Sequence, residues 1–232
     1  MILYQLKDGY RYNSDTLMLY DFALSLNLKG EILEIGTGCG VLGLLLKRDL
    51  KDANLTLMDI QKENIMLCKE NSQMNGIECE ILEGDFNSFK SDKRFDTIIS
   101  NPPYYHDGVI KSQNSHLSIS RYSKNLSLES LIINSNAHLK PNGNLVLCYD
   151  AKQLMDIIVL FHMCKLRLTR LKFIHPKVGK SAKVALIEAK KNSRSLCEIE
   201  PAFYLSDENG YTKQASEIFK SANLQSMDFK EI

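Results

Sequence analysis

The sequence lacks the features that mark a membrane-spanning or secreted protein. Its 232 residues contain no apolar run of the roughly 18 residues that a membrane span needs. The opening stretch, MILYQLKDGYRYNSD, lacks the basic and then apolar order of a secretory signal. We therefore expect a cytoplasmic protein.

The sequence also lacks the cysteine patterns of zinc sites and disulfide frameworks. No two of its six cysteines form a CxxC pair, and none stands near histidines at ligand spacing, so we expect no metal. Internal repeats, low-complexity tracts and linkers are absent as well. The length suits one domain over 1–232, with an N-terminal cap (1–30), a core (31–191) and a C-terminal extension (192–232). A monomer is the simplest expectation.

The net charge is only +1, but the charges are unevenly distributed. Between Lys165 and Arg194 there are ten Lys and Arg residues and a single acid, Glu188. Such a basic segment is typical of a surface that binds a phosphate backbone. The alternative is a solvated surface with no partner.

Short apolar runs alternate with helical patterns through most of the chain, which indicates an α/β fold with a mostly parallel sheet. The helix over 14–26 has Ser14 as its expected N-cap, and the helix over 126–140 is expected to end at Pro-Asn-Gly. Two final strands joined by a loop predict an antiparallel pair. The predicted strands are 31–35, 54–60, 78–82, 95–100, 144–150, 166–176 and 182–191; the other helices are 41–50, 61–76 and 151–165.

A glycine-rich loop, EIGTGCG, follows the first of the core strands and opens a helix. Backbone amides in such a turn face any ligand that lies across it. The loop has glycines at 36, 38 and 40, a GxGxG spacing. The dinucleotide fingerprint GxGxxG requires glycine where this chain has Val41, which disfavours a nicotinamide or flavin enzyme.

Two acids follow the next two strands. Asp59 ends the second strand, where a carboxylate can accept hydrogen bonds from both hydroxyls of a ribose. Asp85 follows the third strand and can hold an adenine amino group, with Phe86 beside the ring. The alternatives are that Asp85 caps a turn before Ser88 and that Asp59 caps the following helix.

These elements together resemble the class I S-adenosylmethionine-dependent methyltransferases over roughly residues 31 to 191. The resemblance implies a Rossmann-like sheet of seven strands, mostly parallel, with an antiparallel last strand pair and helices on both faces. It implies S-adenosylmethionine as cofactor, Glu34 near the methionine moiety and Asp59 on the ribose. Gly36, Gly38, Gly40 and Ile60 join this expected cofactor site.

The fourth strand ends in the motif NPPY, in FDTIISNPPYYHDG. Prolines stop a strand and stiffen the chain that follows. The Asn101 side-chain oxygen and the Pro102 carbonyl can accept the two hydrogens of a conjugated amino group, which makes its lone pair available. Tyr104 can stack on the planar target, typically worth ~1 to 3 kcal/mol for a base. The alternative is a stiff turn whose tyrosines complete a core.

The NPPY motif resembles that of both N6-adenine and protein glutamine N5-methyltransferases. The segments ISNPPYYHDGV and SRYSKNLSLESLI resemble the bacterial family that methylates N6 of an adenosine beside the anticodon of a valine tRNA. So does YRYNSDTLML, where Ser14 and Asp15 replace a Thr-Asp pair expected at the cofactor, and Thr16 stands where relatives tend to have Gly. DENGYTKQASEIF looks like that family's C-terminal Tyr-bearing helix.

The implied substrate is an unpaired adenosine in a tRNA loop, which costs less to extrude than a base in a duplex. Arg11, Lys111 and Arg121 are expected near the mouth of the site, where they can hold phosphates with the basic segment. Tyr105 is a second stacking face or a core residue. Two other functions stay open: a glutamine methyltransferase, disfavoured by the short N-terminal region, and a non-catalytic nucleic-acid-binding module.

Overall fold

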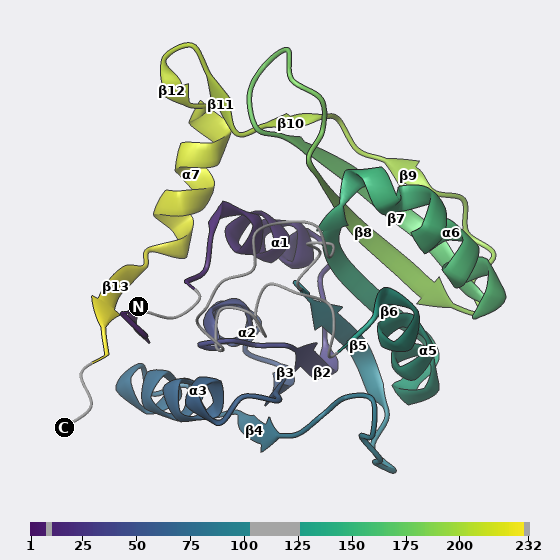
Figure 1. Cartoon of the computed structure of the whole chain (residues 1–232), viewed down its shortest axis with the longest axis horizontal. Coiled ribbons are helices and arrows are strands. Elements are labelled where there is room, and N and C mark those ends of the chain that lie inside the picture. The colour runs from purple at the N-terminus through teal and green to yellow at the C-terminus, as the bar shows by residue number, and fades with distance from the viewer. Residues whose placement is uncertain (8–10, 103–125, 230–232) are drawn as a thin grey trace.

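The computed structural model describes residues 1–7, 11–102 and 126–229, and a nine-stranded sheet forms its centre (Figure 1). The strand order is β10-β7-β8-β6-β5-β2-β3-β4, and β9 also pairs with β7. The strands from β4 to β6 pair in parallel, whereas β8 runs antiparallel to both β6 and β7. The strands are β2 (Gly30–Ile35), β3 (Ala53–Asp59), β4 (Glu80–Glu83), β5 (Phe95–Ser100), β6 (Leu139–Asp150), β7 (Leu166–His175), β8 (Val184–Lys191), β9 (Glu198–Ile199) and β10 (Phe203–Tyr204).

This sheet confirms the predicted fold class. The seven predicted strands are present with their antiparallel last pair, and two short strands of the C-terminal extension lengthen the sheet beyond β7. β9 and β10 have only two residues each, too few for a repeating apolar pattern, so the sequence did not predict them.

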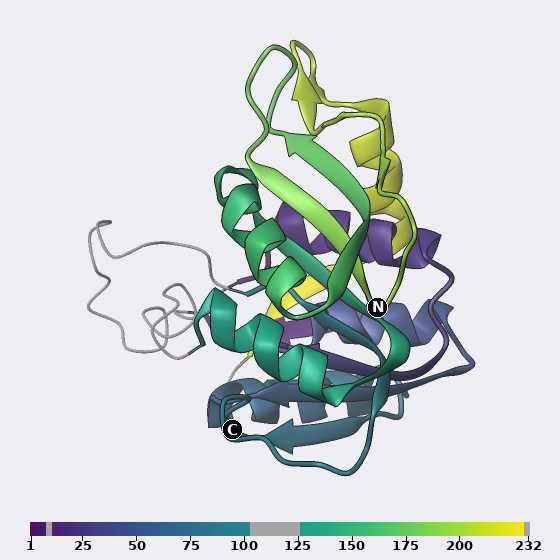
Figure 2. The ribbon, with the colours of Figure 1, turned by 90° about the vertical axis from the view of Figure 1, so that its right-hand side faces the viewer.

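Helices cover both faces of the sheet, because alternate strand residues point to opposite sides. Ile32 belongs to the core with α1, α2 and α7, whereas Leu33 belongs to the core with α5 and α6. Figure 2 shows α5 and α6 on one side of β7 and β8, and α7 on the other. The helices are α1 (Ser14–Ser25), α2 (Val41–Asp49), α3 (Lys62–Met74), α5 (Leu128–His138), α6 (Leu154–Met163, after the 3-10 turn η1, Ala151–Gln153) and α7 (Lys213–Ala222). Among the described residues no helix has both the length and the apolar character to cross a membrane.

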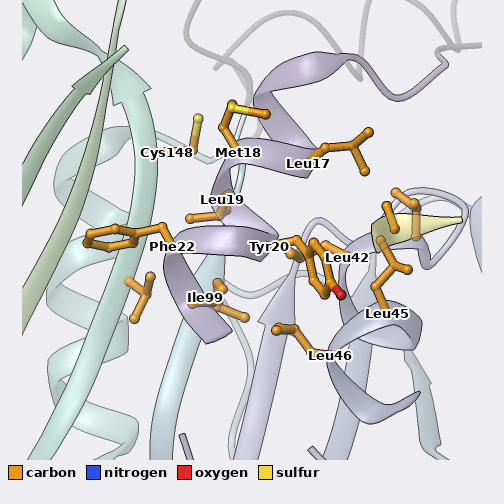
Figure 3. Packing of buried hydrophobic residues seen from close by; sticks show 14 of the residues in the cluster. Leu17, Met18, Leu19, Tyr20, Phe22, Leu42, Leu45, Leu46, Ile99 and Cys148 are labelled. Atoms are coloured by element: carbon orange, nitrogen blue, oxygen red, sulfur yellow. The ribbon is translucent and has the colours of Figure 1, made fainter. Parts of the chain in front are cut away.

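Helix α1 is the centre of the larger core. Figure 3 shows its side chains between α2 on one side and the strands β5 and β6 on the other. Tyr20 and Phe22 are almost wholly buried, at 2% and 1% exposure. The second half of α1 is therefore held firmly in the core. The labelled residues of this core include Leu17, Met18, Leu19, Leu42, Leu45, Leu46, Ile99 and Cys148.

Two predicted helix ends were wrong. The N-cap of α1 is Asn13, whose Oδ1 accepts from the Asp15 amide at 3.0 Å, and not Ser14. Helix α5 ends at His138, and the Pro-Asn-Gly sequence expected to end it lies within β6. The register shifts there, since Phe95 pairs with Leu139 but Thr97 with Asn144, so the extra residues are accommodated in a bulge.

The first and last strands lie side by side, which the sequence did not predict. β1 (Ile2–Gln5) pairs in parallel with β13 (Gln225–Asp228), and α7 packs against α1. The tyrosine expected on the C-terminal helix, Tyr211, lies instead on the small hairpin of β11 (Ser206–Asp207) and β12 (Gly210–Tyr211). Its ring meets Phe219 of α7 edge-on at 4.9 Å between centroids.

Candidate active site

Several of the residues predicted for the site lie where the parallel strands end. Ile35 pairs with Met58 of β3 and with Ser100 of β5, so the glycine loop, Asp59 and Asn101 follow directly at one edge of the sheet. In open α/β sheets, ligands bind outside this carboxyl edge.

The three glycines of the glycine loop have backbone conformations that residues other than glycine rarely adopt. Gly36, Gly38 and Gly40 have φ angles of +69°, +58° and +83°. A Cβ built on Gly36 or Gly38 would meet no atom within 4 Å, whereas one on Gly40 would lie 3.2 Å from Cys68 Sγ. The outer face of the loop is therefore open for a ligand to approach the backbone, and its inner end is packed.

Glu34 braces this loop from beneath. Its Oε2 accepts from Thr37 Oγ1 at 2.8 Å and from the Gly43 amide at 2.9 Å. Burial, opposed by these two hydrogen bonds, raises the pKa of Glu34 to about 8. Gly43 was missed by the sequence reasoning; a Cβ there would lie 2.5 Å from Glu34 Oε2. Its only signal was a glycine inside an apolar helix.

Asp59 joins the loop to the next helix. Its Oδ2 accepts from the Gly38 amide and its Oδ1 from the Gln61 amide, both at 2.9 Å. The second bond is made to the residue before α3, whose N-cap is Gln61 without a side-chain cap bond, so Asp59 does not cap that helix. Each of the two carboxylate oxygens of Asp59 thus accepts from a backbone amide at the edge of the sheet. Ile60 beside it is 43% exposed and offers an apolar surface.

Asp85 and Phe86 form a turn rather than an open surface. Asp85 Oδ1 accepts from the Asn87 amide at 2.9 Å, and its carbonyl accepts from the Ser88 amide, as the capping alternative predicts. The Phe86 ring is 4% exposed and packs against Phe89. The buried ring therefore has little surface for the predicted contact with an adenine.

Asn101 is oriented by a residue on α1. Its Nδ2 donates to Thr16 Oγ1 at 3.0 Å, and Thr16 is only 5% exposed. This bond brings the beginning of α1, with Ser14 and Asp15, to the end of β5. The bond fixes the amide with Nδ2 toward Thr16, and the side-chain oxygen, which is the only acceptor of the amide, therefore also has a fixed position. In the sequence, the only feature that drew attention to Thr16 was that relatives tend to have Gly at this position.

Asn71 of α3 also anchors the loop, and no pattern in the sequence indicated this role. It is fully buried, and its Nδ2 donates to the Cys39 carbonyl at 2.8 Å and to the Tyr4 carbonyl at 3.0 Å. Its Oδ1 accepts from the Tyr4 amide at 2.7 Å. Asn71 therefore connects the glycine loop to β1.

The predicted substrate residues are placed only in part. Arg11 forms an exposed ion pair with Asp228 of β13, 2.8 Å between Nη1 and Oδ1, so its charge is already engaged. Pro102 is buried. Tyr104, Tyr105, Lys111 and Arg121 lie outside the described residues. Within the described part of the chain, no three His, Cys, Asp or Glu side chains are grouped as metal ligands would be.

Comparisons with known proteins agree on the family of the chain. Residues 14–171 match the family described as methyltransferase small domain. A tRNA1(Val) (adenine(37)-N6)-methyltransferase from Glaesserella parasuis is 29% identical over 153 residues, 63% of each chain and so less than two thirds of that relative. The Vibrio cholerae protein of the same name is 26% identical over 88% of this chain and 85% of its own.

Two further matches differ in name. The ribosomal RNA small subunit methyltransferase C of Cronobacter sakazakii is 36% identical over 44% of this chain and 29% of its own. Among solved structures, a predicted O-methyltransferase from Agrobacterium tumefaciens superposes with a TM-score of 0.68 at 19% identity, covering 92% of this chain and 99% of its own. At that identity the structural likeness indicates the fold alone.

Proposed function

The chain belongs to the methyltransferase small domain family, and from this premise we propose that it methylates the exocyclic N6 of an adenosine in tRNA, with S-adenosylmethionine as donor. The observation that carries the proposal is the Asn101 amide, fixed by Thr16 at the end of β5, next to the glycine loop and Asp59. We propose the cytoplasm as the place of reaction.

The residues at the sheet edge fit the donor. Open space over Gly36 and Gly38 lets a ligand approach the backbone, and the two Asp59 oxygens are held in position by amides. The exposed side chain of Ile60 suits an adenine face. In this proposal Ser14 and Asp15 lie at the amino acid end of the donor, and Asp85 lies near its adenine. Glu34 acts beneath the loop by holding its shape.

S-adenosylmethionine supplies a methyl group on a positively charged sulfur. Asn101 Oδ1 accepts one hydrogen of the adenine amino group and the Pro102 carbonyl accepts the other, so the nitrogen lone pair turns toward the methyl carbon. With the donor bound, a nitrogen–carbon bond would form as the sulfur–carbon bond breaks, and the nitrogen would then lose a proton to water. Positioning and fixed acceptors provide the catalysis, and no strong base is required. Tyr104 is proposed to stack on the base.

The names of the relatives support tRNA as the substrate, and an adenosine beside the anticodon of a valine tRNA as the target. The Cronobacter sakazakii relative supports a second candidate, ribosomal RNA, over a shorter alignment. The two candidates differ in the RNA that supplies the base, so a measurement of which RNA is methylated separates them.

The test is to incubate the protein with labelled S-adenosylmethionine and bulk tRNA from a strain that lacks the enzyme, and then to digest the RNA. We expect labelled N6-methyladenosine, and a loss of about 10²-fold or more with Asn101→Ala, since preorganised groups at a reacting centre contribute that much. Asn54→Ala, at the opposite edge of the sheet, is the matched control and should keep full activity. A parallel reaction offers ribosomal RNA from the same strain, and label in that RNA with none in tRNA would refute tRNA as the substrate.

A further inference from the structure

The basic segment between residues 165 and 194 does not form one free surface. Arg170 Nε lies 2.8 Å from Glu200 Oε1, and Lys172 Nζ lies 3.1 Å from Glu200 Oε2. Lys191 Nζ donates to two backbone carbonyls at and near the end of α5. Much of the positive charge on β7 and β8 is therefore used within the fold.

The loop between β7 and β8 is different. We call residues 176–183 the lysine loop, because Lys177, Lys180 and Lys183 are all exposed on it. None of the three forms an ion pair with any described residue. Their charges are available to a partner.

Hydrogen bonds hold the lysine loop in one conformation. The Lys180 amide donates to the Lys177 carbonyl at 3.0 Å and closes a turn in which Gly179 has φ of +78°. The Val178 amide donates to the Ser206 carbonyl at 3.0 Å, and Ser206 Oγ donates to the Pro176 carbonyl at 2.7 Å. The C-terminal extension thus braces the loop, which reduces the entropy lost when a ligand binds it.

The lysine loop lies at the same edge of the sheet as the candidate active site. Val184, which begins β8, pairs with Asp150, which ends β6, and β6 runs parallel to β5 and Asn101. β8 is two strands from β5, roughly 10 Å at the usual strand spacing. Sheet twist turns the loop away from β5, and Figure 2 shows it projecting past α1 and α6. A partner that touches both the loop and Asn101 must be larger than a nucleotide.

We propose that the lysine loop binds the phosphate backbone of the RNA whose adenosine reaches Asn101, an inference that rests on the proposed function. The net charge of +1 gives the protein little overall attraction for RNA, so local positive charge must supply it. Lysines act on phosphates as point charges and position the nucleic acid without selecting its sequence. Base selection then falls to the site at Asn101.

The test compares two triple variants with equal loss of charge. The first is Lys177→Gln/Lys180→Gln/Lys183→Gln. The matched control is Lys29→Gln/Lys51→Gln/Lys90→Gln, three exposed lysines in loops at the opposite edge of the sheet. Binding of bulk tRNA is measured by fluorescence anisotropy over a range of salt concentrations, without the donor. Thermal unfolding of each variant checks that it is folded.

For the loop variant we expect tRNA binding roughly 100-fold weaker at about 0.1 M salt. We also expect the slope of log K against log salt concentration to be less steep by about two to three, which is about one for each lost phosphate contact. The control should bind as the wild type does. Unchanged affinity and slope in the loop variant, or an equal loss in both variants, would overturn the inference. So would a wild-type protein that binds acidic protein but not tRNA.

The same proteins separate this inference from the proposed function. If the wild type binds tRNA through the loop but methylates no RNA, the proposed function fails and the binding surface stands. If both the wild type and the loop variant methylate tRNA with the same KM, the inference fails and the function stands.

Discussion

In the proposed reaction, a single hydrogen bond decides which atom of Asn101 faces the substrate. The carbonyl and amino ends of an asparagine amide have nearly the same shape, but only the oxygen can accept a hydrogen. Thr16 Oγ1 binds Nδ2 at 3.0 Å from a buried position on α1. Without that acceptor, the amide can rotate and present its own hydrogens to the amino group of the substrate, which would oppose the reaction.

We therefore predict that Thr16→Val lowers kcat about tenfold, because about 1.4 kcal/mol of transition-state stabilisation corresponds to that factor. Valine has nearly the shape of threonine but no hydroxyl. Thr16→Ser keeps the hydroxyl and should recover most of the activity. Steady-state kinetics with tRNA gives kcat, and calorimetry gives the affinity for S-adenosylmethionine, which should be unchanged in both variants. A Ser variant as slow as the Val variant would show that the hydroxyl has no positioning role.

The site residues that could be predicted from the sequence are those whose function is local. Three closely spaced glycines, an acid after a strand and the sequence Asn-Pro-Pro are recognisable from a few neighbouring residues. Thr16 and Asn101 are 85 residues apart, and their contact exists only because α1 folds over β5. Asn71 likewise becomes an anchor only once β1 and the glycine loop both lie within reach of its side chain.

At the scale of elements, the glycine loop and α2 act as one unit around a buried carboxyl. Glu34 at the end of β2 accepts from both the loop and the first turn of α2. The close approach of α2 requires Gly43. Because burial without a cation raises the pKa of Glu34 to about 8, the folded protein holds a proton there at neutral pH.

This proton predicts a pH dependence of stability. The pKa of Glu34 is about 8 when folded and near its ordinary 4.5 when unfolded. Between these two pH values the native state binds more protons than the unfolded state. The contribution of Glu34 to the free energy of unfolding is therefore fully present below about pH 4.5 and is lost as the pH rises through about 8. The loss is at most about 1.4 kcal/mol per pH unit. Glu34→Gln stays neutral and lacks this fall. Urea unfolding at about pH 5.5 and about pH 7.5 gives the change in the free energy of unfolding with pH for each protein. An equal change in the wild type and in Glu34→Gln would contradict the assigned pKa.

The elements that could be predicted are those with enough residues to show a period. β5, with six residues, was predicted with its exact bounds, and α2 and α3 to within two residues. β13 has four residues, all exposed, and so no burial pattern to detect. Its pairing with β1 depends on the rest of the fold bringing the two ends of the described chain together.

At the scale of the whole molecule, that terminal pair is connected to the active site. β1 receives backbone hydrogen bonds from the last segment, from the Gln225 amide to the Met1 carbonyl and from the Phe229 amide to the Gln5 carbonyl. On its other side, β1 binds Asn71, which holds the Cys39 carbonyl in the glycine loop. Loss of β13 should therefore affect both stability and the cofactor site.

We predict that a chain ending at Leu224 unfolds with a free energy lower by about 2 kcal/mol or more, since the wholly buried Leu3 of β1 becomes exposed and a leucine gains about that much from burial. Its affinity for S-adenosylmethionine should fall several-fold, because Asn71 loses a fixed partner. Asp228→Ala is the control: it removes only the exposed ion pair with Arg11, worth under about 1 kcal/mol. Urea unfolding and calorimetric titration of the three proteins give both quantities. A truncated chain that loses stability but binds the donor as tightly as before would mean that the terminal strands support the fold without holding the glycine loop.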